Sequence, residues 1–544
     1  MFEISKELIS TDVLVIGGGA SGLIAALEAK NGGLDVAIIS KSRVGRSGNT
    51  IVSGSAMAVL IPEHDSGDTY ELFYEDIIKS GKGINDSKLV DLFVKRSSKI
   101  IDKLTGYGVV FRKVDNRFLK KRPPGHSCPR SVPTDYRGFS YLTRGLSLTL
   151  PLLNRVKTSG IKIIEGTPVV KLLVTDNRIC GAIAIDKKRE KVLLFRTGII
   201  ILASGGGGRI FSRSNNTRDI TGDSYSLAYD AGAVLRDMEF VQFYPTMMYS
   251  PIKMPISNPL FGDGAVLRNS HRERFMENYD KSGDMATRDI MARAIYTEIM
   301  NGRDCNGSVF VDCSTIPENT LKSKYAEFCE YLNRVGIDPL KDLIPVSPGT
   351  HFFMGGLVIN QEGESTIQGL LACGECVGGI HGANRLSGNA LSETVVFGII
   401  AGRTAVKIAE TQSVPSLPPV EIESFRKGSI CLTELKCNLQ ETMWKYVSLI
   451  RNRESLEKAR SRIEEILNLL NYAEIKNIHD LISFYELKNM ITTSRLIVEG
   501  SILRTESRGA HYRSDYPDIN NRNFKGNYFY QNIKGDLNIK FKPI

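Results

Sequence analysis

The chain has 544 residues, of which 42% are hydrophobic and 24% are charged, with a formal net charge of +10 and nine cysteines. This composition suits a soluble α/β protein of several domains and excludes a disordered or fibrous chain. No apolar run is long enough for a bilayer-spanning helix, and the first ten residues lack the layout of a signal peptide. We therefore expect a cytoplasmic protein with no membrane span of its own, or one held at a membrane by a partner.

Residues 13–43 predict a strand, a tight glycine turn, a helix and a second strand. Gly17, Gly19 and Gly22 form the G-x-G-x-x-G pattern that cradles a pyrophosphate. An acid that binds a ribose hydroxyl would be expected at the end of the second strand. Ser40 and Lys41 stand there instead, so the turn predicts a dinucleotide site of an unusual kind.

Two later segments repeat the order of strand and glycine-rich loop. An apolar strand near residue 200 ends in four glycines, Gly205 to Gly208, which let the backbone approach a ligand closely. Residues 366–410 predict a strand, a glycine-rich loop and a long apolar helix. One extended ligand contacted by all three segments would explain them, and FAD fits better than the shorter NAD.

The remaining segments complete the predicted architecture. Residues 237–350 form an inserted domain, 413–421 a proline-rich linker, and 438–470 and 477–503 carry apolar residues at helical spacing. The last 30 or so residues predict an extended tail. The fold class is therefore α/β, a Rossmann-like FAD-binding domain with an inserted α+β capping domain and a C-terminal helical bundle. The expected bounds are 1–236 with 351–412 (FAD-binding), 237–350 (capping) and 413–544 (helical domain with tail).

The cationic charge and the cysteines give weaker signals. The densest cluster is Lys120, Lys121 and Arg122, but no recognition motif accompanies it, so we predict no nucleic-acid partner. Only Cys373 and Cys376 have a redox or metal spacing, and without a second such pair we predict no metal site. Packing of two small residues is favoured for this pair over a redox disulfide.

The motifs together resemble a known family. The segments are SNNTRDITGDSYSLAYDAGAVLRDMEFVQFYPT, RERFMENYDKSGDMATRDIMARAI, HFFMGG, GECVGGIHGANRLSGNAL and RTESRGAHYRSDYP. In this order they resemble the flavoprotein family of succinate dehydrogenase, fumarate reductase and L-aspartate oxidase, over nearly the whole chain. The resemblance implies an FAD-dependent oxidoreductase that transfers hydride between flavin N5 and a C–C or C=C bond of a small carboxylic acid.

The resemblance also implies the cofactor contacts. The family typically ends the second strand with Ser-Lys, as this chain does. Asn49 lies where many succinate dehydrogenases bond a histidine to the flavin, which predicts non-covalent FAD. The implied cofactor-binding residues are Gly17, Gly19, Ala20, Gly22, Ser40, Lys41, Asn49, Thr50, Val169, Gly205, Gly206, Asp223, Glu375, Asn389 and Leu391.

Three residues match the family's catalytic positions. Arg385 matches the arginine that grips a substrate carboxylate, a task suited to a guanidinium fork. His351 matches the histidine that binds the same end of the substrate, and Arg288 matches the arginine that resembles a proton shuttle. Each alone would more commonly be structural, but together, each inside its own motif, they favour catalysis.

The implied substrate-binding residues are Tyr244, Ser257 and His126, and three departures from the family surround them. Tyr244 replaces a carboxylate-binding histidine. Near Ser257, the family's Glu, Arg and Glu are replaced by Asn258, Phe261 and Asp263. The segment that carries a glutamate in aspartate oxidases has Pro123 and Pro124.

These departures leave three functions open. The leading one is a succinate dehydrogenase or fumarate reductase type flavoprotein, acting on fumarate, succinate or a larger unsaturated acid. L-aspartate oxidase and a non-catalytic flavin-binding subunit of a redox complex are the alternatives. The chain carries no iron–sulfur ligands, so we expect an iron–sulfur subunit or another electron carrier as partner. Arg508, His511 and Arg513 are expected to lock the helical bundle to the FAD domain.

Overall fold

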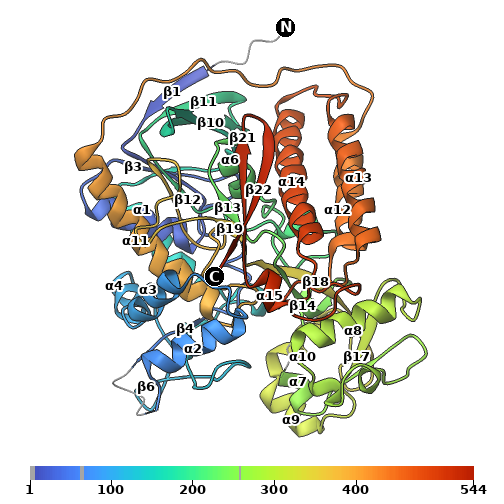
Figure 1. Ribbon diagram of the computed structural model, residues 1–544. Helices are drawn as coiled ribbons and strands as arrows, with labels where there is room; N and C mark the ends of the chain where they lie inside the picture. The colour runs from blue at the N-terminus through green and yellow to red at the C-terminus, as the bar shows by residue number, and fades with distance from the viewer. Residues whose placement is uncertain (1–5, 62–66, 257–258) are drawn as a thin grey trace.

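The structure is a computed structural model that describes residues 6–61, 67–256 and 259–544 (Figure 1). Its central element is a five-stranded parallel sheet in the order β20-β12-β2-β3-β8. The strands are β2 (Val13–Ile16), β3 (Val36–Ile39), β8 (Lys162–Ile164), β12 (Ile199–Leu202) and β20 (Leu370–Ala372). The short apolar runs of β2, β3, β12 and β20 are buried throughout, as expected for a parallel sheet covered on both faces.

The three glycine-rich segments leave adjacent strands of this sheet. β2 and β20 both pair with β12 in parallel, so their carboxyl ends meet at one edge. Helix α1 (Ala20–Asn31) follows the first glycine turn and α11 (Asn389–Thr411) follows the third loop. The two helices touch at Gly402, where an added Cβ would lie 2.4 Å from the Ala25 carbonyl oxygen.

Smaller elements surround this core. The second sheet, in the order β1-β11-β10-β9, contains β1 (Lys6–Ser10), β9 (Val169–Thr175), β10 (Arg178–Asp186) and β11 (Lys191–Arg196). Two short pairs are β4 (Ala56–Ala58) with β7 (Ser131–Pro133), and β5 (Lys113–Val114) with β6 (Arg117–Phe118). The helices are α2 (Tyr70–Ser80), α3 (Ser87–Ser97), α4 (Ile100–Gly106), α5 (Leu146–Thr158) and α6 (Asp223–Asp230).

The inserted segment builds an antiparallel sheet in the order β15-β14-β18-β17-β16, at the lower right of Figure 1. Its strands are β14 (Val241–Met248), β15 (Met254–Pro255), β16 (Val266–Arg268), β17 (Val309–Asp312) and β18 (Ile344–Phe353). Its helices are α7 (Pro259–Gly262), α8 (Arg288–Met300), α9 (Glu318–Lys324) and α10 (Ala326–Arg334). A separate hydrophobic core fills this part. Strand β18 continues past residue 350, so His351 lies on the capping sheet itself.

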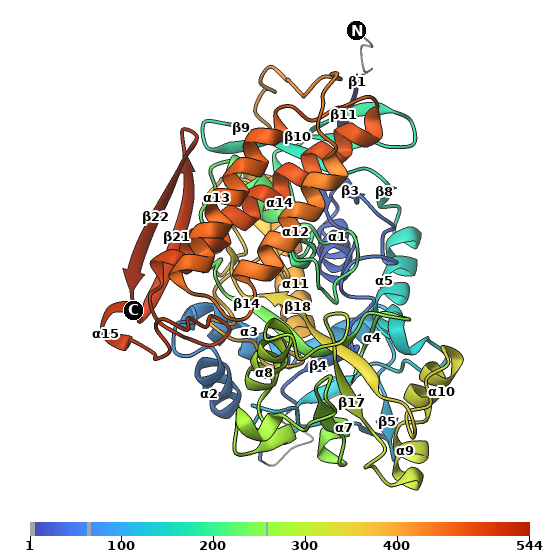
Figure 2. The ribbon, with the colours of Figure 1, turned by 90° about the vertical axis from the view of Figure 1, so that its right-hand side faces the viewer.

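The C-terminal helices are α12 (Leu432–Val447), α13 (Arg453–Leu470) and α14 (Ile478–Leu503), which lie side by side in Figure 2. The helical pattern over 438–470 is therefore interrupted. The second helix, α13, begins directly after Asn452. The Asn452 side chain accepts a hydrogen bond from the Ser455 backbone N–H (2.8 Å) and so caps the start of α13.

The expected extended tail is wrong: the last residues form a β-hairpin. After the short helix α15 (Asn521–Phe524), β21 (Gly526–Ile533) pairs with β22 (Asp536–Pro543). β21 also joins a sheet with β13 (Leu235–Arg236) and β19 (Gly356–Leu357). Tyr528 and Tyr530 lie two residues apart on the same face of β21, and both side chains are buried. Lys534 and Gly535 form the turn of the hairpin, and both have positive φ.

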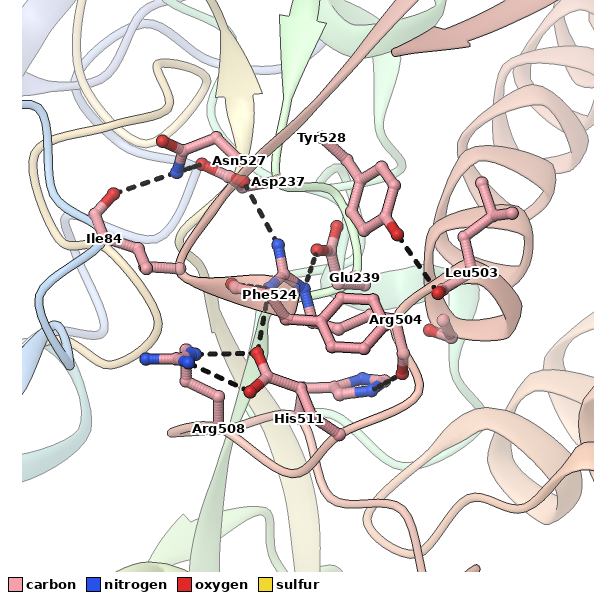
Figure 3. A network of polar contacts seen from close by, with 12 residues as sticks. Ile84, Asp237, Glu239, Leu503, Arg504, Arg508, His511, Phe524, Asn527 and Tyr528 are labelled. Atoms are coloured by element: carbon pink, nitrogen blue, oxygen red, sulfur yellow. Dashed lines mark hydrogen bonds and ion pairs between the residues drawn. The ribbon is translucent and has the colours of Figure 1, made fainter. Parts of the chain in front are cut away.

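Buried charges join this C-terminal part to the strand β14 (Figure 3). Arg504, just after α14, donates from Nε to Glu239 Oε1 (2.6 Å) and from Nη1 to Glu506 Oε1 (3.0 Å). Burial alone would lower the pKa of Arg504, but the carboxylates of Glu239, Asp237 and Glu506 raise it above its usual value. The guanidinium therefore remains charged in the core.

The same network reaches the hairpin and the N-terminal part. Tyr530 donates to Glu239 Oε2 (2.7 Å), and Asn527 donates to Asp237 Oδ2 (2.8 Å) and to the Ile84 carbonyl oxygen (2.9 Å). Arg508 pairs with Glu506 and donates to the Lys82 carbonyl oxygen (2.9 Å). These contacts hold the C-terminal elements against the cofactor-binding part, which is the structural role expected for Arg508.

We expect Arg504→Met to destabilise the protein strongly, because it leaves Glu239 buried without its cation. Breaking one partner of a buried ion pair costs about 3–5 kcal/mol, which for a chain of this size lowers the melting temperature by a few degrees. Arg334→Met is the matched control, since Arg334 makes an exposed pair with Glu330 and such pairs contribute roughly 0–1 kcal/mol. Thermal unfolding followed by circular dichroism checks this, and equal melting temperatures for the two variants would contradict it.

Candidate active site

One cavity of about 410 Å³ runs from the glycine turn after β2 to the capping strands β14 and β18. Many of the residues expected to bind cofactor or substrate line it. These are Gly17, Gly19, Ser40, Lys41, Asn49, Thr50, Val169, Gly205, Asp223, Tyr244, Arg288, His351, Glu375, Arg385 and Leu391. A single extended ligand can therefore contact segments that are hundreds of residues apart in the sequence.

Some glycines of this turn are required for close packing, and others leave space beside the cavity for a ligand. An added Cβ at Gly17 would lie 2.2 Å from the Ala203 carbonyl oxygen, and one at Gly22 would lie 2.0 Å from the Gly17 carbonyl oxygen. Gly19 has only Thr50 Oγ1 nearby, at 3.5 Å, and that hydroxyl accepts a hydrogen bond from the Ala20 backbone N–H (3.3 Å). The glycine turn before the positive end of α1 lines the cavity, which suits a phosphate.

A carboxylate does lie beside Ser40 and Lys41, but another segment supplies it. Lys41 Nζ pairs with Asp223 Oδ2 (2.8 Å) at the start of α6. Burial would lower the pKa of Lys41, but Asp223 and Glu486 outweigh it and raise the pKa. The absence of an acid after β3 is therefore compensated by Asp223, which lines the same end of the cavity.

Glu375 is held in the middle of the cavity wall. Asn49 Nδ2 donates to its Oε2 (3.0 Å) and the Phe353 backbone N–H donates to its Oε1 (3.2 Å). Burial raises the pKa of Glu375 to about 7, although both hydrogen bonds lower it. The carboxyl group is therefore poised to bind a hydroxyl or amide of a ligand near neutral pH.

The far end of the cavity gathers two guanidinium groups. Arg385 donates from Nη2 to Gln242 Oε1 (2.9 Å) and lies 4.5 Å from the centre of the Phe352 ring. Arg288, the first residue of α8, lies 5.6 Å from the centre of the Tyr244 ring. The Nε atoms of both arginines are buried without a hydrogen-bond partner. An anion is the ligand that satisfies them.

His351 between them is uncharged. Burial, with further contributions from Arg385 and Arg288, holds the pKa of His351 well below its usual range. Asn215 Nδ2 donates to Nδ1 of the ring (2.8 Å), while Asn216 fixes the Asn215 amide by donating to its Oδ1 (3.0 Å). The proton of the neutral ring is therefore on Nε2, which is free to donate to a ligand.

Tyr244, which stands where the family has a carboxylate-binding histidine, supplies no positive charge. Its hydroxyl donates to the Ile256 carbonyl oxygen (3.0 Å), and burial raises its pKa. The ring instead packs edge-on against His351, with centroids 5.8 Å apart. Tyr244 thus shapes the cavity as an aromatic wall, and its one donor is already engaged.

Several expected site residues are not on the cavity wall. His126 does not line the cavity: its Nε2 lies 2.8 Å from the Ser387 carbonyl oxygen, so it supports the loop behind the wall. Ser257 and Asn258 lie outside the described residues. Four further expected cofactor residues also do not line the cavity, namely Ala20, Gly22, Gly206 and Asn389. Gly22 packs against the turn, and a Cβ at Gly206 would lie 2.2 Å from Glu375 Oε1, so these two act through packing.

The structure adds residues that the sequence did not single out. Gln242, which orients Arg385, lies two residues before Tyr244 on β14, and the two-residue period of a strand could have indicated it. Asn215, Tyr141 and Arg144 also line the cavity. Tyr141 and Arg144 carry no motif, and only the tertiary structure reveals them.

Cys373 and Cys376 are free, buried thiols. Cys376 Sγ donates to the Leu202 carbonyl oxygen (3.4 Å), and burial raises its pKa to about 12. Both therefore behave as small packing residues. Over the part of the chain that the structure describes, no group of three or more His, Cys, Asp or Glu side chains could hold a metal ion.

The fold and the cavity together define an FAD-binding flavoprotein: three glycine-rich strand ends, a helix start beside the cavity and two carboxylates fit an extended dinucleotide. Comparison with known proteins agrees. Residues 12–391 match a family described as "FAD binding domain", and residues 436–544 match "Fumarate reductase flavoprotein C-term".

Relatives extend the match to whole chains. An uncharacterised FAD-dependent oxidoreductase of Methanocaldococcus jannaschii is 38% identical over 537 residues, covering 97% of each chain. One subunit of the fumarate reductase (CoM/CoB) from Methanothermobacter marburgensis is 37% identical, covering 94% of this chain and 96% of that one. A variant of FrdA from the E. coli quinol fumarate reductase superposes with a TM-score of 0.88 at 25% identity, covering 99% and 97%.

The chain therefore belongs to the flavoprotein family of succinate dehydrogenase and fumarate reductase. It is an FAD-dependent oxidoreductase of that type. Among the described residues, no helix combines the length and the apolarity needed to cross a bilayer.

We expect Gly22→Ala to lose most of its bound flavin, because the new Cβ would overlap the Gly17 carbonyl oxygen and displace the turn from the ligand. Gly106→Ala is the matched control, since an added Cβ there meets nothing within 4 Å. The ratio of absorbance at 450 nm to that at 280 nm in the purified proteins measures the flavin. Full flavin content in Gly22→Ala would refute the packing argument.

Proposed function

We propose that this protein transfers a hydride between N5 of FAD and a carbon of a small carboxylic acid, interconverting a C–C and a C=C bond. The observation that carries the proposal is the joining of Arg288, His351 and Arg385 at one end of the cavity that starts at the glycine turn. The two cations and the neutral donor suit a carboxylate.

Each residue has a distinct role in this proposal. Arg385, oriented by Gln242, binds a substrate carboxylate through its free N–H groups. His351 donates from Nε2 to the same end of the substrate. Holding the carboxylate in this way withdraws electrons from the conjugated C=C bond and makes its distal carbon electrophilic.

FAD, when bound, supplies the hydride donor and acceptor. In this proposal Arg288, which lines the cavity, exchanges the proton on the neighbouring carbon, the role that its motif implies. The same residues can act in either direction, so reduction and oxidation use one site.

We also propose that the FAD is non-covalent. Asn49 uses its amide nitrogen to bind Glu375, and an amide has no nucleophilic nitrogen for a bond to the flavin. Precipitation with acid should leave the yellow flavin in the supernatant. Flavin that stays with the pellet would overturn this assignment.

Electrons must reach the flavin from outside the chain. We propose an iron–sulfur subunit or another electron carrier as the source, in keeping with the fumarate reductase relative, whose name marks it as one subunit of its enzyme. A cytoplasmic location, free or beside a membrane through that partner, fits the nine free cysteines.

The first test is anaerobic. The flavin is reduced with dithionite, the excess is removed, and fumarate and then larger unsaturated acids are added while the absorbance at 450 nm is followed. We expect rapid reoxidation by at least one acid, and Arg288→Lys should slow it by about 100-fold or more. Arg293→Lys, on the same helix but outside the cavity wall, is the control.

Two outcomes would contradict the proposal. Reduction of the oxidised flavin by L-aspartate, with no reaction of fumarate or succinate, would assign the chain as an L-aspartate oxidase. No reoxidation by any acid would assign a flavin-binding subunit without its own catalysis.

A further inference from the structure

Arg144 lines the same cavity but belongs to a segment without a family motif. Its guanidinium lies 4.3 Å from the centre of the Tyr141 ring and 4.5 Å from that of Tyr136. Its Nε atom is buried and has no hydrogen-bond partner. The side chain is thus fixed by stacking, with at least one donor unused.

The anion that Arg144 now contacts is a weak partner. Nη2 pairs with Oε2 of Glu327 (2.5 Å), on helix α10 of the capping part. The Glu327 side chain is 60% exposed, and ion pairs with exposed partners contribute little. By contrast, the carboxylates around Arg504 are fully buried. An anion entering the cavity can therefore compete with Glu327 for Arg144.

Arg144 and the reacting end of the cavity each contact an aromatic ring of the cavity wall. Tyr244 packs against His351, and Tyr141, which also lines the cavity, packs against Arg144. Burial, with a smaller contribution from Tyr244, raises the pKa of Tyr141 to about 12, so both rings remain neutral neighbours. The carboxylates that line the cavity are Asp219, Asp223 and Glu375, on segments that carry the cofactor motifs.

We propose that Arg144 binds a second acid group of the substrate, beyond the aromatic wall of Tyr244 and Tyr141. This rests on the proposed function and deepens it: the preferred substrate is an unsaturated dicarboxylic acid longer than fumarate. One carboxylate is bound by Arg385 and His351, and the other displaces Glu327 from Arg144.

Binding of saturated acids to the FAD-loaded protein, measured by isothermal titration calorimetry, tests this without turnover. We expect adipate, with six carbons and two carboxylates, to bind about tenfold more tightly than succinate and than hexanoate, the monoacid of the same length. Arg144→Gln should weaken adipate binding by about tenfold and change hexanoate binding less than twofold. Arg144→Lys, which keeps the charge but loses the fork, should give an intermediate loss.

Glu327→Gln separates the proposal from a merely structural ion pair. If Glu327 competes with the substrate, its removal tightens adipate binding or leaves it unchanged. If the pair only holds the capping part in place, Glu327→Gln and Arg144→Gln weaken adipate binding equally, and the proposal fails. Arg137→Gln, at an exposed arginine outside the cavity wall, is the matched control.

Other results also bear directly on the proposal. Adipate binding that is no tighter than succinate binding, or that is unaffected by Arg144→Gln, overturns it. The flavin content and the melting temperature of each variant show whether it is folded. If Arg144→Gln is not folded, the binding measurements are made with Arg144→Lys instead. A protein that binds adipate through Arg144 yet transfers no hydride to any acid would refute the proposed function alone.

Discussion

The ion pair between Glu239 and Arg504 is the contact on which the relative placement of three parts of the chain depends. Both side chains are fully buried, so neither charge can be hydrated and each requires the other. Glu239 lies just before β14, Arg504 follows α14, and Tyr530 of the final hairpin donates to the same carboxylate. The helical bundle, the hairpin and the capping sheet therefore share one electrostatic anchor (Figure 3).

The anchor has a direct consequence for the active site. Strand β14 begins two residues after Glu239 and carries Gln242 and Tyr244, of which Tyr244 lines the cavity. Gln242 orients Arg385, and Tyr244 packs against His351. Strand β14 therefore connects the C-terminal network to the cavity wall.

The arginines differ in how their donors are satisfied. Arg504 and Arg508 are each neutralised by buried carboxylates, whereas Nε of Arg144, Arg288 and Arg385 is buried without a partner. Arg451, outside the cavity wall, also has one buried donor without a partner, so this feature alone does not define a binding site. What distinguishes Arg144, Arg288 and Arg385 is that all three line the cavity, and this is the basis of the proposed binding of an acid longer than fumarate.

The sequence by itself determined the Rossmann-like core and the FAD site, because glycine turns and apolar periods are local signals that do not need tertiary context. Arg288, His351 and Arg385 were singled out by the resemblance of their motifs to a known family. Local patterns also predicted the C-terminal helices, but not that the last residues form a hairpin, which β13 stabilises from a distant segment. Only the tertiary structure decided that Asp223 supplies the carboxylate beside Lys41, that His126 stays behind the wall, and that Arg144 enters the cavity. These facts depend on contacts between residues up to hundreds of positions apart, or on which way a side chain faces, and no local pattern encodes them.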